Sequence, residues 1–96
     1  MSLFSWPREL DARGSWRSNQ GDLYRISSRD SRLEISVRMT DGQWLEGSGF
    51  WVHDGESFAY QLGGLEGNVY AIYRPEHDAL EVNGPKGTSW LRRHSE

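Results

Sequence analysis

The chain of 96 residues contains no cysteine, a single lysine (Lys86) and only three prolines. Without cysteine the protein has no disulfide, no thiolate metal site and no cysteine nucleophile. No apolar run approaches the roughly 18 residues that a membrane span requires, so we expect no contact with a membrane. Charged residues between positions 8 and 13 interrupt any signal-peptide pattern, which favours a cytoplasmic protein.

The charge of the chain is slightly negative and unevenly distributed. Residues 1–40 contain seven Arg and five acids, whereas residues 41–96 contain four basic and nine acidic side chains, for a net charge of −3. Neither part has the clearly basic balance of a nucleic-acid-binding domain, so we expect no nucleic-acid partner. Because Arg stacks well on aromatic rings, a chain with five Trp and almost no Lys favours Arg–aromatic pairs.

Turn-forming residues recur along the chain at intervals of roughly ten residues, a spacing typical of consecutive antiparallel strands. These turns are Asp41-Gly42, Asp54-Gly55, Gly63-Gly64, Pro75 to Asp78 and Asn83-Gly84. The segments between them alternate in character, most clearly where Leu33, Ile35, Val37 and Met39 alternate with polar residues. The sequence therefore predicts an all-β antiparallel meander.

The meander should contain about seven or eight strands, enough to close into a small up-and-down barrel without exposed edges. A flattened barrel or a two-sheet sandwich is the alternative. The first predicted strand is interrupted near residues 19–22, by a turn or by a bulge. Predicted strands cover residues 15–28, 33–39, 43–53, 56–62, 67–74, 79–83 and 88–93. We expect one domain over residues 14–96, preceded by an N-terminal arm, residues 1–13.

The first predicted strand opens with Gly14-Ser15-Trp16, and the last contains Trp90-Leu91-Arg92-Arg93. The first tripeptide resembles the Gly-x-Trp signature of the calycins, the superfamily of lipocalins, fatty-acid-binding proteins and avidins. The resemblance implies an up-and-down barrel in which Trp16 packs at the closed end and an Arg from the last strand, Arg92 or its neighbour, lies across it. Trp90 and Arg92 complete the signature that this resemblance suggests.

The resemblance implies two kinds of function. Residues 14–21 look like the opening of an avidin, which suggests a ligand carrier that forms homo-oligomers. A small bacterial protease-inhibitor barrel also opens with Gly-x-Trp, which suggests an inhibitor.

A ligand site follows from the simplest geometry of the Asp41-Gly42 turn. A two-residue type I′ hairpin places Val37, Ile35 and Leu33 opposite Glu46, Ser48 and Phe50. Glu46 and Ser48 then face the interior and orient a ligand, together with Arg92. The apolar walls of this site would be Trp16, Trp44, Phe50, Tyr60 and Trp90.

The turn at Asp54-Gly55 predicts a different register for the same strand. It places Trp51 opposite Phe58 and Gly49 opposite Tyr60, which directs the odd-numbered residues of 43–53 inward. Both registers hold only if a bulge intervenes, and Gly47 or Gly49 is the natural position for it. In this alternative Glu46 turns outward and pairs with an Arg, because an unpaired buried carboxylate is costly.

The histidines offer little support for catalysis. Glu76-His77-Asp78 places two acids around a His, suited to a metal or to acid–base work, but it follows Pro75 in an evident turn. His53 flanks a hairpin turn opposite Glu56, which favours a surface cross-strand pair, and His94 lies in a polar tail. An enzyme would need Glu46 in one cavity with His53 or His77. We therefore expect no catalytic residue, no cofactor and no metal.

The leading hypothesis is a non-catalytic binding protein that takes a small apolar or planar ligand in or at the mouth of the barrel. The alternative is a protein–protein interaction or inhibitor module. It would use exposed aromatic side chains and an arm whose apolar residues are Leu3, Phe4, Trp6 and Leu10. Aromatic residues on the later strands would form either such a platform or the core; these are Trp51, Phe58, Tyr60, Tyr70 and Tyr73.

Overall fold

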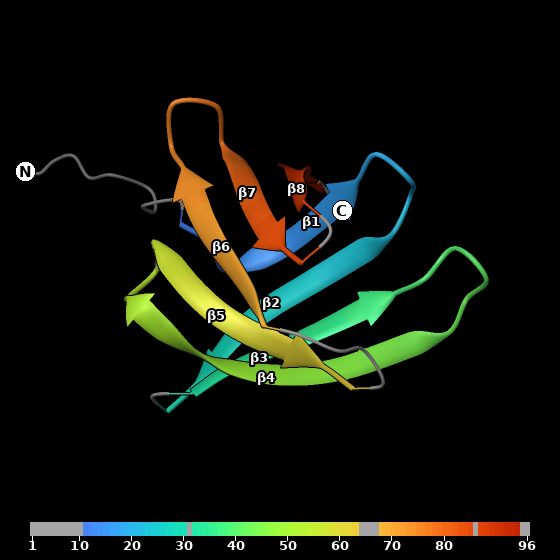
Figure 1. Ribbon diagram of the computed structural model, residues 1–96, viewed down its shortest axis with the longest axis horizontal. Coiled ribbons are helices and arrows are strands. Elements are labelled where there is room, and N and C mark those ends of the chain that lie inside the picture. Colours follow the sequence, from blue (N-terminus) through green and yellow to red (C-terminus); the bar gives the residue numbers. More distant parts are fainter. Residues whose placement is uncertain (1–10, 31, 64–67, 86, 95–96) are drawn as a thin grey trace, which may run out of the picture.

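The computed structural model describes residues 11–30, 32–63, 68–85 and 87–94, and these form a closed barrel of eight antiparallel strands (Figure 1). Each strand pairs with its neighbour in the sequence, and β8 closes the barrel against β1. The strands are β1 (Gly14–Ser18), β2 (Leu23–Arg29), β3 (Arg32–Arg38), β4 (Trp44–His53), β5 (Ser57–Leu62), β6 (Val69–Arg74), β7 (Ala79–Gly84) and β8 (Gly87–Arg93). The predicted all-β meander barrel is confirmed.

The interruption in the first predicted strand is a turn, so this segment forms two strands. The Ser18 amide donates to the Asp22 carbonyl at 3.0 Å, and the Gly21 amide donates to the Ser18 carbonyl at 3.1 Å. Gly21 has a φ of 94°, which glycine adopts without a steric penalty. This turn brings the count to the upper of the two predicted values.

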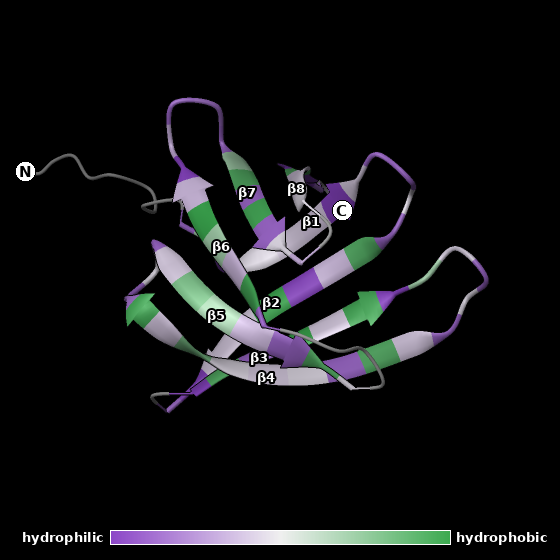
Figure 2. Cartoon of the chain, in the orientation of Figure 1, coloured by the Kyte–Doolittle hydropathy of each residue, from purple (hydrophilic) through white to green (hydrophobic). Residues whose placement is uncertain are grey.

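Alternating side chains from every strand fill the barrel, as the hydropathy colours along β6 and β7 illustrate (Figure 2). Trp16, Phe58 and Leu80 are completely buried inside it. Tyr60, Ala71 and Tyr73 also belong to the core. Three of the five aromatic residues predicted as platform or core, Phe58, Tyr60 and Tyr73, are therefore core residues, whereas Tyr70 is exposed. Other buried members are Ile26, Leu33, Ile35, Val37 and Leu91.

The segment before β1 is part of the domain from residue 11 onward. Ala12 is fully buried in the core, and its amide donates to the Gly55 carbonyl at 2.8 Å. The predicted contacts of Leu3, Phe4, Trp6 and Leu10 lie outside the described residues.

The β3–β4 hairpin differs by one residue from the predicted type I′ turn. The Met39 amide donates to the Gln43 carbonyl at 2.7 Å, and the Gly42 amide donates to the Met39 carbonyl at 2.9 Å. The loop therefore has three residues, Thr40 to Gly42, and Gly42 has a positive φ of 91°. A type I turn followed by a glycine of positive φ is the usual three-residue hairpin loop. The prediction of a two-residue loop was wrong.

This extra loop residue reverses the two faces of β4. Val37, Ile35 and Leu33 pair with Leu45, Gly47 and Gly49 rather than with Glu46, Ser48 and Phe50. Because side chains alternate with a period of two, a slip of one residue sends each side chain to the opposite face. The prediction that Trp44, Glu46, Ser48 and Phe50 face the interior is therefore wrong, and all four point outward.

The register predicted from the Asp54-Gly55 turn is confirmed between residues 47–51 and 58–62, but His53 pairs with Ser57 and not with the predicted Glu56. Trp51 pairs with Phe58, Gly49 with Tyr60 and Gly47 with Leu62. The irregularity in this ladder lies between Trp51 and His53, not at either glycine. Both glycines instead allow close approach, since an added Cβ at Gly47 would collide with the Gln61 carbonyl and one at Gly49 with the Ala59 carbonyl. The long strand β4 curves around the barrel (Figure 1).

Candidate functional site

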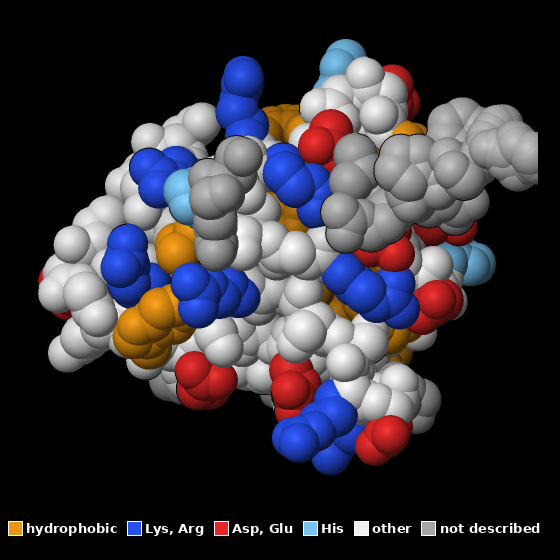
Figure 3. Space-filling model, turned by 180° about the vertical axis from the view of Figure 1, so that it is seen from behind, with side chains coloured by type: hydrophobic (Ala, Val, Ile, Leu, Met, Phe, Trp, Pro, Cys, Tyr) orange, Lys and Arg blue, Asp and Glu red, His pale blue; other side chains and the backbone are white. Residues whose placement is uncertain are grey.

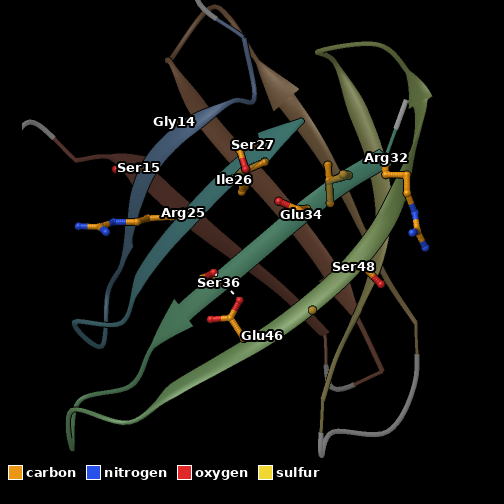
Figure 4. A pocket seen from close by; sticks show the side chains of 12 residues that line it. Gly14, Ser15, Arg25, Ile26, Ser27, Arg32, Glu34, Ser36, Glu46 and Ser48 are labelled. Atoms are coloured by element: carbon orange, nitrogen blue, oxygen red, sulfur yellow. Dashed lines mark hydrogen bonds between the residues drawn. The ribbon is translucent and has the colours of Figure 1, made fainter. Parts of the chain in front are cut away.

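A groove of about 690 Å³ lies on the outer face of β1 to β4. Its lining is mostly polar, because the outward residues of these strands are Ser, Arg and Glu (Figure 4). The groove is lined by Gly14, Ser15, Arg25, Ile26, Ser27, Arg32, Leu33, Glu34, Ser36, Glu46, Gly47 and Ser48. Short serine side chains across the middle of the sheet leave the space that the longer Arg and Glu side chains surround.

Glu46 and Ser48, the polar residues predicted for an interior site, lie in this outer groove. The Ser36 hydroxyl donates to Glu46 Oε1 at 3.0 Å, and these two residues are directly opposite each other on β3 and β4. Glu46 thus turns outward, as the alternative prediction required, but the described partner of its carboxylate is a serine and not an Arg. Glu34 and Ser48 form the next outward pair along the same two strands.

Trp44 lies two residues before Glu46 on the same outer face of β4, and Arg25 of the groove lining stacks on it. The guanidinium carbon of Arg25 lies 5.4 Å from the centroid of the Trp44 ring, and Trp44 is 43% exposed. This pair confirms the expected stacking of Arg on aromatic rings, as do Arg13 on Trp51 at 4.7 Å and Arg93 on Trp16 at 4.2 Å. A stacked, half-exposed Trp is a rigid surface suited to contact with a partner.

A row of arginines crosses the outer face beside this Trp. Arg92 on β8 lies directly opposite Arg17 on β1, and Leu23 on β2 lies between Arg17 and Arg38 on β3. Arg38 in turn lies opposite Trp44. We call Arg17, Arg38 and Arg92 the arginine row. Seen from behind, basic side chains gather on this side of the molecule next to an exposed hydrophobic group (Figure 3).

The arginine row has no acidic partner in the described part of the chain. None of its three guanidinium groups forms a hydrogen bond or an ion pair with a described residue, whereas Arg13, Arg74 and Arg93 are all ion-paired. Arg17 and Arg38 were not predicted as site residues from the sequence. Their positions in the alternating pattern place them outward, but only the strand register shows that they are neighbours.

The other residues predicted for the site are separated by the fold. Phe50 is 61% exposed on β4 beyond the groove, while Tyr60 is 4% exposed in the core, where burial raises the pKa of its hydroxyl well above the usual value. Trp16 is at the end of the barrel where the segment before β1 packs between Trp16 and Gly55, which we call the closed end. Trp90 is 44% exposed on the outer face of β8. The five predicted walls therefore do not line a single cavity.

The closed end is organised around Trp16 and Arg93 rather than Arg92. Arg93 Nη1 and Nη2 donate to the carbonyl oxygens of Arg13 and Asp11 at 2.8 and 2.7 Å, and Nη2 also donates to Asp78 Oδ1 at 2.9 Å. Trp16 Nε1 donates to the Ala12 carbonyl at 2.9 Å. The choice of Arg92 was wrong because Arg92 is on the outward-facing side of β8.

Gly14 of the tripeptide has a structural role in the same network. A Cβ at Gly14 would lie 2.8 Å from Arg93 Nη1, and the φ of Gly14 is 126°. Glycine therefore leaves the space that the Arg93 side chain needs to reach the backbone before β1.

A second, smaller pocket of about 230 Å³ lies at the opposite end of the barrel, between the β1–β2 turn and the β7–β8 hairpin. Asp22, which is 9% exposed, contributes a carboxylate to it, and Trp90 forms part of its rim. The remaining lining residues are Ser18, Asn19, Gln20, Tyr24, Val82, Thr88, Ser89 and Leu91.

The turn that contains Glu76, His77 and Asp78 is solvated at its first two residues. Asp78 points back to the closed end, where hydrogen bonds from Arg93 hold the pKa of its carboxyl below the usual range. Across the described ranges, no group of three or more His, Asp or Glu side chains is arranged to bind a metal ion. Within the same residues there is no helix with the length and apolar character to cross a membrane.

Comparison with known proteins found no family model, no curated protein and no solved structure that matches this chain.

Proposed function

We propose that the protein is a non-catalytic binding module that receives a segment of a partner protein in the groove on the outer face of β1 to β4. The observation that supports the proposal is the groove itself, since it combines about 690 Å³ of open space with the stacked Arg25–Trp44 pair. Trp and Arg are the residues most enriched at the energetic centres of protein interfaces.

The burial of apolar side chains inside the barrel favours an outer site over an enclosed one. Trp16, Phe58 and Leu80 are completely buried, whereas Trp44, Phe50 and Trp90 are exposed. The groove also offers hydroxyls, carboxylates and guanidinium groups together, which suit the amide donors and acceptors of a polypeptide. In this proposal the Trp16–Arg93 contact serves stability, and the barrel is calycin-like in architecture.

A photo-crosslinking experiment tests this proposal. The photoreactive amino acid p-benzoylphenylalanine replaces Ser48 in the groove or, as the control, the exposed Glu76 in the β6–β7 turn, in cells that naturally produce the protein. We expect a discrete protein adduct from position 48 and none from position 76. Equal adducts at both positions, or none at position 48, would contradict the proposal.

The smaller pocket, between the β1–β2 turn and the β7–β8 hairpin, supports a second candidate function, the binding of a small ligand. Its volume of about 230 Å³ falls below the usual range for drug-sized ligands, roughly 300–1,000 Å³, so the ligand would be small. Ser89→Phe should fill this pocket and abolish any ligand-induced rise in melting temperature found in a metabolite screen. A ligand that still stabilises the Ser89→Phe variant equally would show that the pocket is not its site.

A further inference from the structure

We propose that the partner segment is acidic, and that a cluster of its Asp or Glu side chains binds the arginine row, Arg17, Arg38 and Arg92. This inference rests on the proposed function, since it specifies the chemistry of the segment that enters the groove. The inference goes beyond the proposed function because it places the main charge contacts on residues outside the groove lining.

The strand register places the row at a spacing that suits several carboxylates. Neighbouring strands are about 4.8 Å apart, so Arg92 and Arg17 are neighbours and Arg38 lies roughly 10 Å from Arg17, two strands further on. The planar guanidinium group binds a carboxylate through two parallel hydrogen bonds. Two or three acidic side chains of one segment can therefore each meet an Arg, while the same segment continues past Trp44.

The free protein is destabilised by this arrangement. Like charges directly opposite each other on neighbouring strands repel, and Arg92 and Arg17 are such a pair. Neither has an ion-pair partner in the described ranges, although the chain has more acidic than basic residues. An acidic partner would remove this repulsion, and a neutral one would leave it in place.

The charges next to the row favour an acidic polypeptide over a nucleic acid. Glu34 and Glu46 lie in the groove a few residues along β3 and β4 from Arg38 and Trp44. A phosphate backbone carries a charge at every step and would be repelled where it met these carboxylates and by the net charge of −3. A polypeptide can place its acids against the row and uncharged residues in the groove.

Fluorescence anisotropy with a labelled peptide tests the inference. The probe is a 14-residue peptide with four Glu at one end and Gly, Ser and Thr at the other, and its reference is the same peptide with Gln in place of Glu. The double substitution Arg17→Glu, Arg92→Glu should weaken binding of the acidic peptide at least tenfold. The control is Arg29→Glu, an exposed Arg six residues along β2 from Leu23, roughly 20 Å away. It should change the affinity less than twofold.

A milder variant keeps the result interpretable if charge reversal disturbs the fold. Arg92→Gln removes one of the two opposed charges, so it should keep or slightly raise the melting temperature while weakening the acidic peptide about threefold or more. A purely structural role for Arg92 would instead lower the melting temperature and leave binding unchanged.

Five outcomes decide the inference. Selective loss in the row variants, with preference for the Glu peptide over the Gln peptide, supports it. Equal losses from Arg29→Glu and the row variants overturn it in favour of bulk charge. Tighter binding of a 14-nucleotide single-stranded DNA than of the acidic peptide overturns it in favour of nucleic acid. An unchanged adduct at position 48 in the Arg17→Glu, Arg92→Glu variant overturns it while leaving the proposed function intact, whereas absence of any adduct in the wild type removes both.

Discussion

The guanidinium group of Arg93 lies over the ring of Trp16, with its central carbon 4.2 Å from the ring centroid. The first strand and the last strand are thereby joined, since Trp16 and Arg93 are also directly opposite each other in the β1–β8 ladder. The same guanidinium group satisfies two backbone carbonyls of the segment before β1 and the carboxylate of Asp78. One side chain thus links both ends of the described chain and the β6–β7 turn.

Replacement of Arg93 by Lys should lower the free energy of unfolding by about 2–3 kcal/mol, because an ammonium cannot stack on Trp16 and serve all three acceptors at once. Urea denaturation followed by tryptophan fluorescence measures this change. Arg92→Lys is the matched control, one residue away on the exposed face, and should stay within about 0.5 kcal/mol of the wild type. Similar losses in both variants would show that the closed-end network is not a major source of stability.

The depressed pKa of Asp78 predicts a pH dependence. Its carboxyl has a lower pKa in the folded protein, chiefly because Arg93 donates hydrogen bonds to it. A depressed folded pKa stabilises the protein above the usual carboxyl value of about 3.9, and this contribution disappears as the pH falls through the folded pKa. Asp78→Asn should therefore be less stable than the wild type at pH 6, with the difference shrinking below pH 4. Urea midpoints at pH 6, 4 and 3 check this, and a difference independent of pH would refute it.

The glycines of β4 should resist substitution. A Cβ at Gly49 would collide with the Ala59 carbonyl on β5, and a main-chain carbonyl cannot move aside as a side chain can. We expect Gly49→Ala to lose about 3 kcal/mol or to fail to fold, at the upper end of the cost of overpacking. The control is Gly84→Ala, whose nearest neighbour is a Val69 methyl at an ordinary 3.8 Å. It should unfold at nearly the wild-type temperature, and comparable losses at both sites would rule out the close approach.

Two tryptophans should behave in opposite ways when truncated. Trp16 is completely buried, so Trp16→Ala should cost about 3–5 kcal/mol of stability. Trp44 is 43% exposed and stacks on Arg25, so Trp44→Ala should cost no more than about 1 kcal/mol. The same Trp44→Ala variant should weaken the acidic peptide, which separates binding from folding. Thermal unfolding by circular dichroism distinguishes the two, and an unfolded Trp44→Ala variant would contradict the outer position of this residue.

Much of the fold could be predicted because its signals are local. Turn dipeptides such as Asp54-Gly55 and the alternation of Leu33, Ile35 and Val37 depend only on neighbouring residues. The register that follows Asp54-Gly55 was predicted correctly from Trp51 and Phe58 onward for this reason, although the pairing of His53 was not. The Asp41-Gly42 turn was not, because the same dipeptide fits a two-residue and a three-residue loop, and only the β4–β5 pairing decides between them.

The candidate site was predictable in its residue types but not in its location. Glu46 and Ser48 were predicted as site residues inside the barrel, but they line a groove on its outer face. Arg17 and Arg92 are 75 positions apart in the sequence and meet only because β8 closes the barrel against β1. No pattern within β1 or β8 indicates that Arg17 and Arg92 are neighbours, since each is simply an outward-facing Arg in its own strand.

The sequence by itself determined the antiparallel meander and the number of strands to within one, because turn propensity and period-two patterning act over a few residues. The tertiary structure alone decided which face of β4 is inside, which of Arg92 and Arg93 covers Trp16, and which arginines become neighbours. These three outcomes depend on the register of strands across the closed barrel. A shift of one residue in a register reverses a whole face, and local preferences differ too little to select it.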